Sequence, residues 1–338
     1  MTSADWERGG HHGAMILLDL ALVAAASAFA YSIGAHYTGA CMGMPYAAGA
    51  IRLVPALLLM APFVVAGAFL ASGAVEATVG HGILSTATVA IPIAVAIVVS
   101  AFCLTSAYNL VAIPTSTIQI LVFSAVGAGL GADLGIRWGT IEALLVVWAS
   151  APFAACGLGF GFARLIDRWG QGRTGDGTTS RLTTHAAAAL VAIGAAASFA
   201  MGANDVANAS GALVMTGLFG LAVAGLIGGV GMALGVLTWG RPLLKRVAFD
   251  VVKLDPRTAA ASQLAQSAVI LVSVSFGYFT SMNQALVGAM IGAGLSRSRS
   301  TVSRRAVGGI LVGWGVGPVS GAALGFALAS AFSWGHLL

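Results

Sequence analysis

The segment that decides the fold is Met201-Gly202-Ala203-Asn204-Asp205-Val206-Ala207-Asn208-Ala209-Ser210-Gly211. It puts two amides, one acid and one hydroxyl between apolar runs at 184–201 and 212–237. Polar groups at membrane depth are costly and persist mainly for function. Asp205 and Asn208 are three residues apart, so a helix would present them on one face. The segment therefore predicts an ion site inside an apolar helical bundle, with an ordinary capped loop between two spans as the alternative.

The composition excludes a water-soluble globular protein. Of the 338 residues, 58% are hydrophobic and only 8% are charged, and the mean hydropathy is +0.94. Soluble domains carry about 25% charged residues. The net charge of +5 comes from Lys and Arg concentrated in short loops, which indicates orientation in a membrane and gives no reason to expect a nucleic acid partner.

The apolar segments predict an all-α, polytopic membrane protein of about ten transmembrane helices, since a span needs ~20 apolar residues. The candidate spans lie near 15–33, 47–70, 83–105, 107–131, 139–163, 184–201, 212–237, 258–276, 282–295 and 306–332. They divide the chain into a polar tail (1–14), a first repeat (15–163), a basic linker (164–183), a second repeat (184–332) and a C-terminal tail (333–338).

The basic residues fix an expected topology. They cluster at 164–181, 241–257 and 297–305, and two spans separate each cluster from the next. All three clusters can then be cytoplasmic, with both termini outside. We expect the plasma (inner) membrane, with the lipid bilayer as the surrounding partner. The oligomeric state stays open, with a homodimer as one option.

Internal similarity predicts that the two halves are inverted five-span repeats. Gly34-Ala35 leading to Gly43 parallels Gly202-Ala203 leading to Gly211. The segment from Thr115 to Leu130 matches the segment from Thr280 to Leu295, which pairs Gln119 with Gln284, and Trp148 to Pro152 matches Trp314 to Pro318. We expect Gly34, Gly43, Gly202 and Gly211 to break the helices, so that free backbone N–H groups and the positive helix end face an anion while Asp205 holds a cation.

These residues carry a resemblance to a family. Gly-Ala-Asn-Asp-Val-Ala-Asn-Ala at 202–209 resembles the signature of the inorganic phosphate transporter (PiT) family, and the segments 113–117 and 278–281 stand where that family has a second, hydroxyl-rich element. The resemblance implies two inverted repeats with an ion-coupled anion site between them. It implies a phosphate and cation site that includes Asn204, Asp205 (a sodium ligand), Asn208, Ser116, Thr117, Thr280 and Ser281.

The first copy of the signature departs from the second. His36, Tyr37 and Ala40 stand where the second copy has Asn204, Asp205 and Asn208, so one of the two expected carboxylates is missing. His36 would titrate near neutral pH, which makes a proton an alternative to sodium as the coupling ion. We expect Gln119 and Gln284, at equivalent depth, to be ligands or to bridge helices.

The main hypothesis is therefore ion-coupled secondary transport of inorganic phosphate by alternating access. A proton-coupled sulfate permease of the same superfamily is the second hypothesis, and an anion channel is the third. An enzyme is not expected: the chain has no P-loop and no Gly-x-Ser-Gly, and no cofactor is implied besides the coupling ion. Glu76, His81 and Asp133 fall in predicted outer loops, where a solvated or ion-attracting surface is the default.

Overall fold

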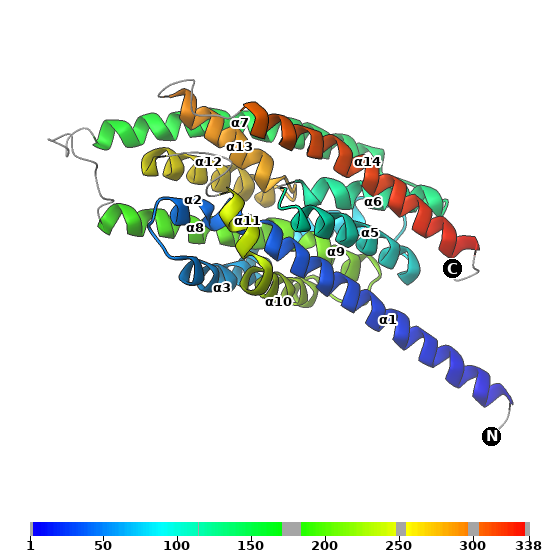
Figure 1. Ribbon diagram of the computed structural model, residues 1–338. Coiled ribbons are helices and arrows are strands. Elements are labelled where there is room, and N and C mark those ends of the chain that lie inside the picture. The colour runs from blue at the N-terminus through cyan, green and yellow to red at the C-terminus, as the bar shows by residue number, and fades with distance from the viewer. Residues whose placement is uncertain (1–2, 114, 171–183, 248–254, 297–303, 335–338) are drawn as a thin grey trace.

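A computed structural model describes residues 3–113, 115–170, 184–247, 255–296 and 304–334, which form a bundle of helices (Figure 1). In the first half these are α1 (Ser3–His36), α2 (Thr38–Ala47), α3 (Leu53–Ala71), α4 (Gly73–His81), α5 (Ile91–Leu110), α6 (Thr117–Gly131) and α7 (Trp138–Gly170). In the second half they are α8 (Thr184–Asp205), α9 (Ala207–Met215), α10 (Leu221–Trp239), α11 (Arg241–Arg246), α12 (Pro256–Ser275), α13 (Met282–Leu295) and α14 (Arg304–Trp334).

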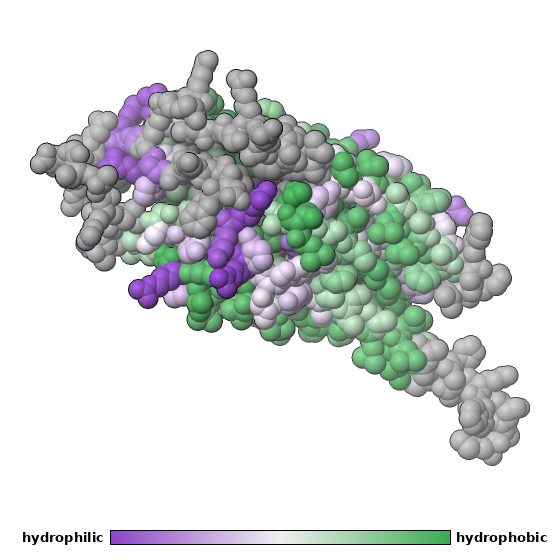
Figure 2. Space-filling model, viewed as in Figure 1, coloured by the Kyte–Doolittle hydropathy of each residue, from purple (hydrophilic) through white to green (hydrophobic). Residues whose placement is uncertain are grey.

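Eight stretches of the described chain are long and apolar enough to cross a membrane, and α6 and α13 are shorter apolar helices. Figure 2 shows hydrophobic residues over most of the visible face, with the hydrophilic ones gathered mainly toward the end away from the start of α1. An apolar outer surface of this kind matches a lipid surrounding. The predicted span 107–131 is wrong at its start, because α5 runs to Leu110 and α6 begins only at Thr117.

Local sequence explains several helix boundaries. Asp255 caps α12 by accepting the backbone N–H of Arg257 at 2.9 Å and of Thr258 at 3.2 Å, with Pro256 in the first turn, where its missing N–H costs nothing. Pro152 and Pro318 lie inside long helices. Neighbouring helices make such prolines tolerable in membrane bundles.

The two signature segments form kinks rather than open breaks. One kink lies at Tyr37, between α1 and α2, and the other at Val206, between α8 and α9. Helical bonding begins again after each kink: Cys41 N–H donates to the Tyr37 carbonyl at 3.1 Å, and Ser210 N–H to the Val206 carbonyl at 2.9 Å.

The glycine prediction was also wrong about position, since Gly34, Gly43, Gly202 and Gly211 all lie within helices. Gly34 and Gly202 are instead points of close helix packing. A Cβ at Gly34 would stand 1.9 Å from the Met232 carbonyl oxygen of α10, and one at Gly202 would stand 2.0 Å from the Val64 carbonyl oxygen of α3. Small residues let membrane helices approach this closely.

Two helices that begin inside the bundle, α6 and α13, each follow a non-helical segment. α6 packs on α14, and α13 packs on α7. In the bundle as a whole, α1 begins and α14 ends toward one end of the molecule. α7 ends and α8 begins at the opposite end (Figure 1). The predicted linker begins as the last turns of α7, and its residues 171–183 lie outside the described part of the chain.

Candidate functional site

The second-half signature segment (residues 202–211) holds its polar side chains fully inside the bundle. Asn204, Asp205 and Asn208 are each 0% exposed. The Asn204 amide pairs twice with the backbone of Thr280: its Nδ2 donates to the Thr280 carbonyl at 2.8 Å, and its Oδ1 accepts the Thr280 N–H at 3.1 Å. Asn204 Nδ2 also donates to Asp205 Oδ2 at 3.1 Å. Through these hydrogen bonds Asn204 holds the kink between α8 and α9 against the segment that precedes α13.

The first-half signature segment (residues 34–43) makes the corresponding contact with a different residue. His36 Nε2 accepts the backbone N–H of Thr115 at 3.1 Å, just before α6. With Nε2 as acceptor, the ring proton is assigned to Nδ1, which lies 2.6 Å from Asn109 Oδ1. The Asn109 amide in turn donates to the Ser32 carbonyl at 2.8 Å. His36 thereby fastens the kink of α1 and α2 to the segment that precedes α6.

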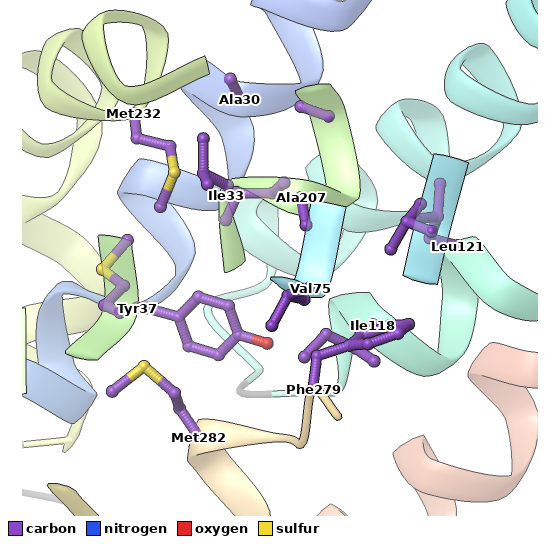
Figure 3. Close-up of a cluster of buried hydrophobic side chains, with 14 of the residues drawn as sticks. Ala30, Ile33, Tyr37, Val75, Ile118, Leu121, Ala207, Met232, Phe279 and Met282 are labelled. Atoms are coloured by element: carbon purple, nitrogen blue, oxygen red, sulfur yellow. The ribbon is translucent and has the colours of Figure 1, made fainter. Parts of the chain in front are cut away.

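The two segments meet through Tyr37. Its hydroxyl lies 3.0 Å from Thr117 Oγ1 and also hydrogen-bonds with the Asp205 carboxylate. Asn208 Nδ2 donates to the same Thr117 hydroxyl at 3.3 Å. Figure 3 shows the Tyr37 ring reaching into the middle of the bundle, with Met282 and Val75 near it. Tyr37, Thr117, Asp205 and Asn208 thus form one cluster built from both halves.

Two helix N-termini lie together beside this cluster. Ser116 caps α6 and Ser281 caps α13, each accepting a backbone N–H of the following glutamine at 3.4 Å. Gln284 Nε2 donates to Gln119 Oε1 at 3.2 Å, so the predicted pair of glutamines makes direct contact. Helix N-termini carry partial positive charge and unpaired N–H groups, which favour anions. The anion-directed helix ends are therefore those of α6 and α13.

Several buried oxygens of this region have no hydrogen-bond partner within the protein: Asp205 Oδ1, Asn208 Oδ1, Thr280 Oγ1 and Gln284 Oε1. Buried polar atoms are nearly always satisfied, so such a group calls for a water, an ion or a ligand. Three of the four atoms are pure acceptors, and one belongs to an acid. The site can therefore take a cation, or an anion that itself carries an O–H group.

The structure brings together most of the residues predicted from sequence. It adds Asn283, whose amide donates to the Thr115 carbonyl at 2.7 Å and lies 3.4 Å from His36 Nε2. It also adds Asn109. Both are amides within apolar sequence, so the criterion that identified Asn204 could have found them. Ser116 and Ser281 use their hydroxyls as acceptors for helix caps, while their O–H groups remain able to donate.

A cavity of about 540 Å³ adjoins the glutamine pair. It lies between α6, α13, α7 and α14, and its mostly apolar wall includes Trp148 and Trp314. Trp148 Nε1 donates to the Phe279 carbonyl at 3.0 Å, which steadies the segment before α13.

Comparison with known proteins identifies relatives over nearly the whole chain. The model of the phosphate transporter family matches residues 33–180 and 171–325. The sulfate permease CysP of Bacillus subtilis is 28% identical over 93% of this chain and 88% of its own length. A probable low-affinity inorganic phosphate transporter of Mycobacterium tuberculosis (strain H37Rv) is 27% identical over 88% of this chain and 74% of its own length.

A solved structure shares the fold. It is described as the sodium-dependent phosphate transporter and superposes with a TM-score of 0.86 at 20% identity, covering 94% of this chain and 99% of that one. Together with the apolar helices, these matches establish an integral, multi-pass membrane protein of a transporter family that is not enzymatic. The chain belongs to the phosphate transporter family.

Proposed function

We propose that this protein is an ion-coupled secondary transporter of inorganic phosphate, with a single anion site between its two halves. The N-termini of α6 and α13 would supply donors to the anion, together with the hydroxyls of Thr117, Thr280 and the two capping serines. Hydroxyls and N–H groups bind an oxyanion without a permanent cation, which lets it leave again. The two halves would rock about this site in alternating access.

The observation that carries the choice of phosphate is the unpaired Oδ1 of Asp205. Inorganic phosphate keeps at least one P–OH group at neutral pH and needs an acceptor for it, whereas sulfate has no proton to donate. With the coupling cation beside it, Asp205 can stay ionised; it is then an acceptor only, which can accept the P–OH of phosphate and finds no proton on sulfate. Asp205 is fully buried, so this preference would act with little screening.

The same unpaired oxygens indicate which cation could be coupled to transport. Asp205 Oδ1 and Asn208 Oδ1 are hard acceptors suited to sodium, with Asp205 as its charged ligand. The name of one solved relative specifies sodium dependence, which supports this part of the proposal. A proton is the alternative coupling ion.

The inverted duplication is part of the proposal, and equivalent contacts in the two halves support it. Thr115 and Thr280 stand at equivalent positions of the sequence, and each donates its backbone N–H to the residue before a kink, His36 or Asn204. The equivalent glutamines Gln119 and Gln284 touch each other. Such contacts between matching residues are those expected near a pseudo-two-fold axis.

We propose the plasma (inner) membrane as the location, with both chain ends outside and the basic loops in the cytoplasm. Two of the basic clusters lie together, since Arg257 of α12 is 3.8 Å from Asp167 of α7. α1 begins and α14 ends toward the opposite end of the bundle from this α7 terminus (Figure 1). A homodimer within the lipid bilayer is compatible with this topology.

Sulfate transport is the second candidate. The Bacillus subtilis relative is named a sulfate permease, and the first-half segment has lost the acid that the second-half segment keeps. Loss of an acceptor removes a reason to prefer a protonated anion. An anion channel is the third candidate, and flux coupling separates it from both carriers.

The test is uptake of labelled phosphate and labelled sulfate into proteoliposomes that contain the purified protein, with a sodium gradient or a proton gradient imposed separately. The proposal expects saturable phosphate accumulation that excess sulfate does not compete away. Sulfate accumulation driven by the proton gradient would establish the second candidate instead. Downhill flux of either anion without accumulation under any gradient would indicate a channel.

A further inference from the structure

Glu76 is a buried acid that the phosphate site does not use. The sequence placed it in a solvated outer loop, and that prediction was wrong: Glu76 lies within α4 and is 1% exposed. α4 packs mainly against α9, the helix that carries Asn208 and Ser210. The bundle therefore encloses a second carboxyl group, on the helix α4 that packs against α9.

Among the described residues, the surroundings of this carboxyl group contain hydroxyls and no cation. Its Oε1 contacts the hydroxyl of Ser210, and the hydroxyl of Ser72 also hydrogen-bonds with it. Gly225 of α10 covers it closely, because a Cβ there would stand 3.1 Å from Oε1. An ionised carboxylate without a positive partner is costly in such a place.

The helices packed against α4 offer no counter-ion in their described residues. α3, α9 and α10 contain no ionisable side chain. α12 has only Arg257 at its first turn, whereas α4 meets the opposite end, where Thr78 donates to the Gly277 carbonyl at 2.8 Å. His81, on α4 itself, is exposed to the surroundings of the bundle.

The proton inventory indicates which form of Glu76 fits. Ser210 Oγ donates to the Val206 carbonyl at 2.9 Å, and Ser72 Oγ donates to the Ala68 carbonyl. A serine hydroxyl has one proton, which Ser210 can give either to Glu76 or to Val206; the second choice leaves only its lone pairs facing Glu76. The hydrogen between Ser210 Oγ and Glu76 Oε1 must in that case come from the carboxyl group.

We propose that Glu76 is a proton-binding site that couples protonation to the kink between α8 and α9. In the protonated form the carboxyl O–H would donate to Ser210, and Ser210 would donate to Val206, the residue at the kink beside Asp205. When α4 and α9 separate, the Glu76 O–H bond breaks, the proton passes to water, and the carboxylate remains. As far as coupling is concerned, the proposal rests on the transport function with the proton, the alternative coupling ion, as a coupled ion.

The first experiment does not depend on transport. Infrared spectroscopy of the purified, full-length protein should show a carboxylic acid C=O band at neutral pH that Glu76→Gln removes. Glu142→Gln is the matched control, since Glu142 is exposed on α7, and it should leave the band in place. A wild-type spectrum without a band lost in Glu76→Gln would overturn the proposal. So would a band that added sodium abolishes at constant pH, because the site would then bind sodium.

The second experiment separates coupling from transport in proteoliposomes. Glu76→Gln should lose accumulation of phosphate driven by a proton gradient and keep phosphate-for-phosphate exchange. One coupled proton can sustain about a tenfold accumulation per pH unit of gradient, since tenfold corresponds to ~1.4 kcal/mol. Ser210→Ala should shift the pH midpoint of uptake without abolishing it. Unchanged proton-driven accumulation in Glu76→Gln would contradict the coupling role.

The two experiments keep the two proposals apart. If the wild-type protein transports neither phosphate nor sulfate, the proposed function fails, and the infrared result still decides whether Glu76 binds a proton. If transport is intact but Glu76→Gln matches the wild type in both experiments, only the Glu76 proposal fails.

Discussion

The two signature segments occupy corresponding kinks, yet they differ in what their side chains leave free. In the first-half segment His36 uses both ring nitrogens within the protein, and Tyr37 hydrogen-bonds with Thr117. In the second-half segment Asp205 and Asn208 each keep one buried oxygen without a partner. The first-half segment has thus kept the contact that holds a helix start in place and has lost the oxygens that could bind an ion. Ligand binding and helix positioning are separable tasks of one motif.

The most damaging change to this arrangement should be Asn204→Leu. It keeps the size of the side chain but leaves the Thr280 N–H and carbonyl unpaired in the bundle. Each unpaired buried group costs about 1–3 kcal/mol, so we expect a loss of about 2–6 kcal/mol and no measurable transport. Thermal unfolding of the detergent-solubilised protein and uptake in proteoliposomes measure the two effects. Wild-type stability would mean that Asn204 does not hold the start of α13.

Tyr37→Asp would restore the missing acid and so reduce the difference between the segments. The new carboxylate would face Asp205 across the space that the longer Tyr37 side chain now fills. Without a cation, an uncompensated buried charge should cost about 3–5 kcal/mol. We expect sodium to raise the unfolding temperature of this variant more than that of the wild type. Tyr37→Phe adds no charge and should gain no sodium dependence, and equal sodium responses of the two variants would count against a shared ion site.

Gly202→Ala and Gly34→Ala test whether the glycines serve packing in both halves. Each new methyl group would meet a backbone carbonyl within 2.0 Å, of Val64 or of Met232. Overpacking of this kind costs about 1–3 kcal/mol. Gly157→Ala is the control, because a Cβ there meets nothing within 4 Å. If all three variants unfold at the same temperature, the close helix approach at Gly34 and Gly202 is not important for stability.

His36→Asn should have the smallest effect, since Asn204 makes the corresponding contact in the other half. The amide oxygen can accept the Thr115 N–H in place of Nε2. Asn109 Oδ1 loses the donor at Nδ1, so we expect a cost of about 1 kcal/mol in stability, and an unchanged pH profile of transport. The pH profile of phosphate uptake is the measurement. A profile that becomes flat in this variant would make His36 the coupling group.

Much of the architecture could be predicted because hydropathy directly reports the length of a membrane span. The boundary between α5 and α6 could not, because the non-helical residues 111–113 are as apolar as the helices around them. The same ambiguity hid Glu76. Its short helix α4 is less apolar than a span, and only packing against α9 and α10 reveals that it is buried.

The site residues found from sequence belong to the signature or to segments that match between the two halves. Asn204, Asp205 and Asn208 were found in this way, whereas Asn109 and Asn283, the latter directly before the predicted Gln284, belong to no such pattern. The pattern could not show that the glycines pack helices, because a glycine at a kink and one at a helix crossing look the same in sequence. Nor could it show that the anion-directed helix ends belong to α6 and α13.

The most direct test of the account is the preference for phosphate over sulfate in Asp205→Asn. Binding of labelled phosphate to the purified protein, competed with sulfate, gives this preference without requiring transport. A hydrogen bond to a charged acceptor contributes about 1.5–3 kcal/mol, so the variant should lose roughly 10–100-fold of the preference. Asp133→Asn, at an exposed acid far from the site in sequence, should keep the wild-type preference. An unchanged preference in Asp205→Asn would contradict the claim that the free oxygen of this buried acid selects phosphate.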